Sequence, residues 1–116
     1  MGDLPKEFEE LFHKAVDNGK LEEWQELTKK AINLKDKHGI SALHKASDQG
    51  NMPMVKYLIE KGAQIDAQTN NGSTPLHLAA AKNNLDVVKF LILNGAQINA
   101  EDKCGRTSFH MAAVNR

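Results

Sequence analysis

The sequence has little of what marks a secreted, membrane-spanning or nucleic-acid-binding protein. Its 116 residues include a single cysteine, Cys104, so no disulfide can form within the chain. Its longest apolar runs, among them 78–81 and 90–93, are far shorter than the roughly 20 residues that cross a bilayer, and residues 1–10 contain no run typical of a signal peptide. Lysine plus arginine equal aspartate plus glutamate at 15 each, so no positive excess is available for a phosphate backbone. We therefore expect no membrane and no nucleic acid as partners, and a cytoplasmic or nuclear location.

What the chain does contain is an internal repeat with a period of 33 residues. Residues 63–67 (AQIDA) recur as residues 96–100 (AQINA). At this length the chain has room for one ordinary hydrophobic core and not for two, so we interpret residues 1–116 as a single repeat domain. Three further series of residues keep the same spacing: Gly39, Gly72 and Gly105; His44, His77 and His110; and Ala46, Ala79 and Ala112.

The period divides the chain into units. Residues 36–68 and 69–101 form two full repeats, and residues 102–116 form a partial one that stops after its first predicted helix. Residues 3–35 follow the pattern more loosely and are more polar, which is typical of a degenerate N-terminal capping repeat. The incomplete last unit favours a piece of a longer array. The alternative is a natural end that frays or that a partner covers.

Each full unit predicts a turn, a short helix and a second helix. In the second unit, Asn70-Asn71-Gly72 is a turn sequence. Thr74 is a good N-cap and Pro75 suits the first helical position, so we expect a helix over residues 75–82, closed by Asn83. The first unit has Ser41 and Gly50 in the same two roles.

The second helix of each unit carries an apolar stripe. Asn51 and Asn84 are the expected N-caps, and Gly62 and Gly95 end the helices. The connectors that follow are expected to be extended, with one buried isoleucine each. A helix pair this small cannot bury its stripe alone, so neighbouring units must stack to complete the core. The two stripes are Met52, Val55, Leu58 and Ile59, and Leu85, Val88, Leu91 and Ile92.

This pattern resembles the ankyrin repeat, whose signature is T-P-L-H-x-A. The signature is complete at residues 74–79 (TPLHLA) and weakened at 41–46 (SALHKA) and 107–112 (TSFHMA). The resemblance implies an all-α ankyrin-repeat solenoid of helix-turn-helix pairs with β-turn or hairpin tips, about three and a half repeats long. It also implies a protein that binds other proteins through a concave face of turn tips and first helices.

Catalytic and metal chemistry find little support in the residues. Histidines that recur once per repeat would stand about 10 Å apart and could not share a zinc ion with ligand distances of about 2 Å. We expect each imidazole to bond backbone or threonine groups of a turn, as the resemblance also implies. Ser41, His44 and Asp48 could suggest a hydrolase, but no nucleophile elbow accompanies them. We therefore expect no enzyme activity, no metal and no cofactor. Cys104, between Lys103 and Arg106, is interpreted as a tolerated turn residue rather than a reactive thiol.

The expected partner-binding residues are those that the resemblance places on the concave face. This face is poor in the aromatic and arginine side chains that usually anchor interfaces, which predicts modest affinity or help from further repeats. Ile40 and Arg106 are the best anchor candidates. The predicted residues are Lys37, His38, Ile40, Asp48, Gln49, Asn70, Asn71, Ser73, Ala81, Lys82, Lys103 and Arg106.

The leading interpretation is a non-enzymatic interaction module: a scaffold, an adaptor or a competitive inhibitor. One alternative is a structural element that self-associates weakly, end to end, by stacking through its uncapped C-terminal repeat. Another is an ankyrin protein that inhibits a kinase, an idea that rests on size and fold analogy alone.

Overall fold

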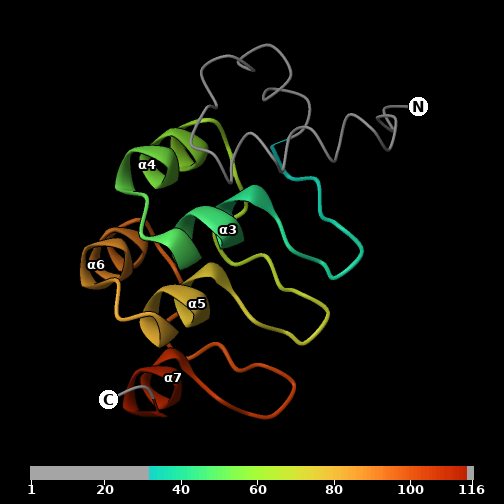
Figure 1. Ribbon diagram of the computed structural model, residues 1–116, viewed down its shortest axis with the longest axis vertical. Coiled ribbons are helices and arrows are strands. Elements are labelled where there is room, and N and C mark those ends of the chain that lie inside the picture. The colour runs from blue at the N-terminus through green and yellow to red at the C-terminus, as the bar shows by residue number, and fades with distance from the viewer. Residues whose placement is uncertain (1–31, 115–116) are drawn as a thin grey trace.

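The structure is a computed structural model that describes residues 32–114 (Figure 1). The predicted N-terminal repeat at residues 3–35 therefore lies almost wholly outside the described residues. The described part is a stack of helices joined by turns, with one isolated antiparallel bridge between Lys35 and Ser41. None of its helices is both long and apolar enough to cross a bilayer. Its elements are α3 (Ala42–Gln49), α4 (Met52–Glu60), α5 (Pro75–Ala81), α6 (Leu85–Leu93) and α7 (Ser108–Val114).

The first helix of each repeat begins with a reciprocal cap. The Ser41 hydroxyl accepts from the backbone N–H of His44, while the His44 ring accepts from the backbone N–H of Ser41. Thr74 and His77 repeat this arrangement at the start of α5, where Pro75 occupies the first turn. Each cap satisfies two donors that a helix start otherwise leaves open. The serine or threonine and the histidine of the repeated sequence signature thus together cap the start of the first helix.

The expected helix ends are confirmed for the first helices. Gly50 closes α3 with φ 70°. Asn83, just beyond α5, has φ 60°, which asparagine tolerates better than most residues.

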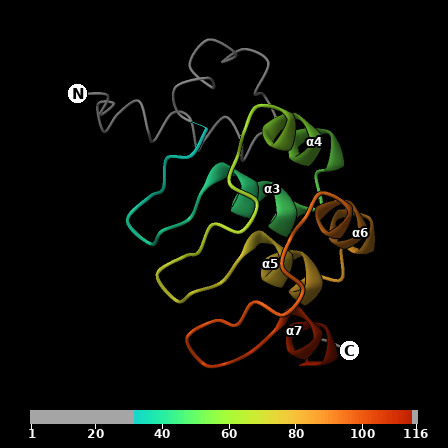
Figure 2. The same cartoon turned by 180° about the vertical axis from the view of Figure 1, so that it is seen from behind.

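Two layers of helices make the core (Figures 1 and 2). The inner layer is α3, α5 and α7, in which α5 packs against both of its neighbours, and α4 and α6 pack behind α3 and α5. Ala46 and Ala79 are fully buried on the inner helices, and their small side chains let the helices approach closely. Repeat-to-repeat packing buries Leu43 and Leu76 to 1% exposure each.

Asn84 occupies the expected N-cap position of α6, but its side chain makes no cap bond; its amide donates to the carbonyls of Ser47 and Asp48 in the preceding repeat. Three other local expectations were wrong. The connectors turn at 65–66 and 98–99 rather than running extended. Ile98 is 38% exposed, and Leu85 of the predicted stripe is 57% exposed.

The exposed apolar positions share one cause. They lie in the last full repeat, where the described part contains no following outer helix to pack against α6. The equivalents of Leu85 and Ile98 in the repeat before, Met52 and Ile65, are partly buried against the core.

Candidate binding surface

Three turns project from the inner helices on the side opposite α4 and α6 (Figures 1 and 2). We call them tip 1 (36–40), tip 2 (69–73) and tip 3 (102–106). Each is closed by the same backbone bond, from the N–H of its first residue to the carbonyl of its last, at 2.9–3.0 Å. In each, the fourth residue is a glycine with φ between 76° and 80°, a left-handed conformation that favours glycine. The spacing of the three glycines in the sequence therefore reports three copies of one turn.

The acidic residues of the tips have their charge turned inward. Oδ1 of Asp36 accepts from the N–H groups of His38 and Ile40 at 2.9 and 3.0 Å. Oδ1 of Asp102 accepts from the N–H groups of Cys104 and Arg106, both at 2.9 Å. Each carboxylate thus accepts hydrogen bonds from backbone N–H groups of its own tip.

Asp102 is held still more firmly than this, because Oδ2 also accepts from Nε of Arg106 at 2.9 Å. The backbone N–H of Arg106 and then its guanidinium lower the pKa of the Asp102 carboxyl below its ordinary value. Thr69 takes the same place in tip 2, its hydroxyl oxygen accepting from Asn71 and Ser73 at 3.2 Å each.

Neighbouring tips are linked in sequence order. The backbone N–H of Asn70 donates to the His38 carbonyl at 3.0 Å, and its side-chain amide donates to the Lys37 carbonyl at 2.9 Å. The N–H of Lys103 donates to the Asn71 carbonyl at 2.9 Å. These bonds hold the tips at a set spacing, which preorganises whatever their exposed side chains contact.

The recurring histidines bind their own cap and the next tip. His77 is 1% exposed; its Nδ1 accepts from the N–H and hydroxyl of Thr74 at 3.1 and 2.8 Å, and its Nε2 donates to the Arg106 carbonyl at 2.7 Å. His44 makes the same contacts to Ser41 and to the Ser73 carbonyl. Because a backbone N–H can only donate, Nδ1 must be the acceptor and Nε2 must carry the proton. The predicted structural role of these histidines is confirmed for His44 and His77.

Burial gives His44 a pKa below its ordinary value, because the folded environment disfavours the charged ring. The residues that the structure describes contain no group of three His, Cys, Asp or Glu side chains arranged to hold a metal ion.

The structure places most of the predicted binding residues at the surface. Lys82 and Asp48 meet across the inner helices, with Nζ and Oδ1 3.7 Å apart. Cys104 is exposed, as its turn position predicted. Asp17 and Asn18, which the repeat pattern places at the level of Asp48 and Gln49, lie outside the described residues. The exposed set is Lys37, His38, Gln49, Asn70, Asn71, Lys82, Lys103 and Arg106, and the half-buried set is Ile40, Asp48, Ser73 and Ala81.

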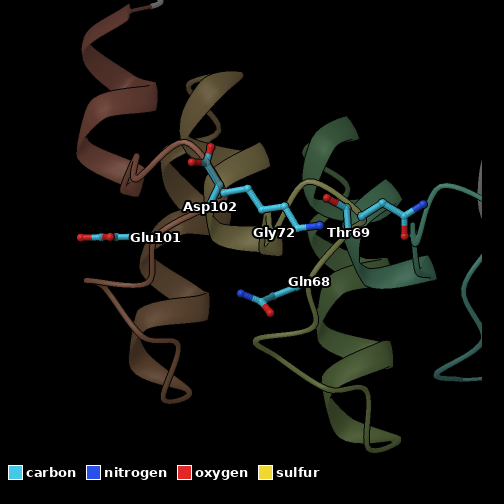
Figure 3. Close-up of a pocket in the computed structure, with 7 residues that line it drawn as sticks. Gln68, Thr69, Gly72, Glu101 and Asp102 are labelled. Carbon is cyan, nitrogen blue, oxygen red and sulfur yellow. The ribbon is translucent and has the colours of Figure 1, made fainter.

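A cleft between tips 2 and 3 was missed by the sequence reasoning. It is an open cleft with a volume of about 420 Å³ beside Lys103. In Figure 3 the carboxyl group of Asp102 turns away from Glu101, toward the start of α7. Gln68 and Glu101 each precede a tip by one residue. The 33-residue period could therefore have identified them as equivalent positions, but nothing in their side-chain chemistry predicted a cleft. We call this space the tip cleft; its lining is Gln68, Thr69, Asn70, Gly72, Glu101, Asp102 and Lys103.

Two cross-links between tips 1 and 2 have no counterpart at the tip cleft. Nζ of Lys35 donates to the Gln68 carbonyl at 2.8 Å, and Asn70 binds tip 1 as described above. The equivalent residues one repeat later are Gln68 and Lys103. Within the described part of the chain, neither of these side chains forms a hydrogen bond or ion pair. Tips 2 and 3 are joined through the backbone, with room left beside them.

The C-terminal end of the stack exposes apolar side chains. Phe109 occupies the position of Leu43 and Leu76, yet it is 71% exposed where they are 1% exposed. Ile92 and Leu93, at the end of α6 in the last full repeat, are 37% and 83% exposed. Phe109 is thus an inter-repeat position that no helix covers within the described residues.

The fold and these surfaces define the class: a stack of helical repeats with a row of rigid tips along one side. A family model of ankyrin repeats, in three copies, matches residues 12–102, which is most of the chain. The chain therefore belongs to the ankyrin-repeat family, and the predicted all-α ankyrin fold is confirmed. A search of curated proteins found no match. Ankyrin repeats are generally protein-interaction modules and are typically non-enzymatic.

Proposed function

We propose that this chain binds a protein partner through its tips and the adjoining ends of α3 and α5, acting as a scaffold, an adaptor or a competitive inhibitor. One observation carries the proposal. The backbones of the three tips are fixed by repeated hydrogen bonds, while most of the side chains predicted to bind a partner are exposed. Rigid presentation of exposed side chains lowers the entropy cost of binding.

The Asp48–Lys82 pair allows a sharp test. The variant Asp48→Lys with Lys82→Glu reverses both charges and keeps opposite charges facing each other, so folding is preserved while the surface pattern changes. The matched control is Lys56→Glu with Glu60→Lys on α4, both exposed and on the outer layer. All three proteins are used for affinity capture from an extract of the source cells.

We expect a partner that the unmodified chain and the α4 control retain and that the inner-helix variant loses. An enzyme partner whose activity falls on binding identifies an inhibitor, and a second protein bridged through the chain identifies an adaptor. Capture that is the same for all three proteins would overturn the assignment of this face.

The proposal includes a cytoplasmic or nuclear location, supported by the exposed free thiol of Cys104, which suits a reducing compartment. Fractionation of cells that express a tagged chain tests this. Recovery of the tagged chain from a secreted or oxidising compartment would contradict it.

A second candidate function is self-association through the C-terminal end, favoured by the 71% exposure of Phe109. Sedimentation velocity should then show a dimer that grows with concentration and disappears in Phe109→Lys. A chain that stays monomeric at millimolar concentration excludes this function.

A further inference from the structure

Within the described residues the two tip lysines, Lys37 and Lys103, form no ion pair, whereas the tip carboxylates accept hydrogen bonds. The carboxylates of Asp36 and Asp102 accept hydrogen bonds from the N–H groups of their own tips. Lys37 and Lys103 are exposed, and neither ammonium group forms an ion pair within the described part of the chain. The tips therefore expose lysine ammonium groups, while their carboxylates are directed at tip N–H groups.

The two lysines stand in register. Lys37, Asn70 and Lys103 are each the second residue of their tip and are spaced by one repeat. Asn70 acts as a spacer, because its amide is bound to the Lys37 carbonyl. At about 8–10 Å per packed helix layer, two repeats separate the lysine backbones by about 16–20 Å. An extended chain covers that distance in about five to six residues.

The tip cleft adds a polar binding position at one end of this row. Gln68 and Lys103 both line it, and Gln68 offers an amide donor that no other described residue uses. Glu101 and Asp102 are the opposing charges in the lining. The Asp102 carboxylate is bound to Cys104 and Arg106. The Glu101 carboxylate turns toward its own tip, with Oε1 4.0 Å from where a Cβ on Gly105 would lie. In Figure 3 the Glu101 side chain points away from Gln68. A carboxylate that enters the cleft thus meets a donor and a cation.

We propose that the row Lys37–Asn70–Lys103, together with the tip cleft, binds an extended acidic segment of the partner protein. One carboxylate pairs with Lys37, and a second, six residues away, enters the tip cleft beside Lys103 and Gln68. A separation of six rather than five follows from the strand period, because only even separations place both side chains on one face. This inference rests on the proposed protein-binding function and specifies the chemistry of the partner.

The test uses blocked, threonine-rich peptides of about twelve residues, long enough to span the row when extended. One carries two glutamates six residues apart, a second carries them five apart, and a third replaces both with glutamine. Binding to the isotopically labelled full chain is followed by amide shifts in NMR spectra, which suit weak affinities. We expect the six-residue spacing to bind most tightly, with shifts at Lys37, Asn70 and Lys103.

The protein variants are Lys37→Gln and Lys103→Gln, with Lys56→Gln on α4 as the matched control. Exposed ion pairs predict that each tip variant weakens binding about 1.5- to 5-fold and that the control leaves it unchanged. Equal binding of the glutamate and glutamine peptides overturns the inference, and so does equal loss in the α4 control. An oligothymidylate of matched charge that binds as tightly also overturns it, since the row would then respond to negative charge in general.

The failure of this inference is distinguishable from failure of the proposed function. If capture of a partner still depends on the Asp48–Lys82 pair while no acidic peptide binds, the interaction face stands and the acidic-segment proposal falls. If neither depends on the tips or inner helices, both fall.

Discussion

Replacing His77 with alanine should destabilise the whole stack, because this side chain binds two repeats at once. Its ring accepts from the Thr74 N–H and hydroxyl and donates to the Arg106 carbonyl at 2.7 Å. The ring is 1% exposed, so water cannot replace these bonds without opening the structure. Three lost hydrogen bonds at about 1 kcal/mol each, plus the cavity left by the ring, predict a loss of about 3–5 kcal/mol. That is a large share of the roughly 5–15 kcal/mol typical of a domain.

Two further variants separate the causes of this loss. His77→Asn keeps a short acceptor near Thr74 but cannot reach the Arg106 carbonyl, so about 1–3 kcal/mol of the loss should remain. His110→Ala removes the same cap contacts at Thr107, 3.0 and 3.1 Å, from an exposed side chain that contacts no further tip among the described residues. We expect it to cost less than about 1 kcal/mol.

Urea unfolding followed by far-UV circular dichroism measures all three variants against the unmodified chain, with slopes compared to check that unfolding stays two-state. The reasoning is refuted if His110→Ala costs as much as His77→Ala, since the link to the next tip would then contribute nothing. It is equally refuted if His77→Ala costs less than about 1 kcal/mol.

Three other predictions follow from burial. Burial lowers the pKa of His44, so as the pH falls the unfolded chain binds a proton at this residue before the folded chain does. The free energy of unfolding should therefore be unaffected by His44 above about pH 6.5 and should decrease below that pH. Urea midpoints measured against pH should show a smaller decrease for His44→Asn. Ser47→Ala should be neutral or stabilising by up to about 1 kcal/mol in thermal unfolding, because the buried hydroxyl has no partner among the described residues and the next repeat has Ala80 at this position; a clear loss would reveal a bond to that hydroxyl. Phe109→Ser should cost under about 0.5 kcal/mol where Leu76→Ala costs about 2–5, and similar costs would mean that Phe109 is covered in solution.

The helix starts and ends could be predicted because they depend on contacts within a few residues. A serine or threonine cap, the histidine three positions later and the closing residue at 50 or 83 satisfy backbone groups locally, and the structure confirms them. Asn84 also occupies its expected N-cap position, but its side chain makes no cap bond. Its amide donates to two carbonyls in the preceding repeat, and the sequence spacing contains no information about that contact.

The candidate surface likewise has features that the sequence predicted and features that it did not. The exposure of Lys37 and Lys103 was predicted, because turn positions with little packing role face water. The pairing of Asp48 with Lys82 and the tip cleft beside Lys103 were not, since both arise between repeats. The boundaries of the four predicted units remain predictions.

The sequence by itself determined the repeat: its period, its capped helices, its glycine turns and its membership of the ankyrin family. These follow from local backbone chemistry and from a spacing that stacks like units on one another. The tertiary structure alone decided which of the equivalent residues are buried and which are exposed. Leu43 and Leu76 are buried and Phe109 is exposed, although all three have the same local sequence setting. Burial depends on which helix lies against a residue, and that is a property of the stack rather than of the repeat.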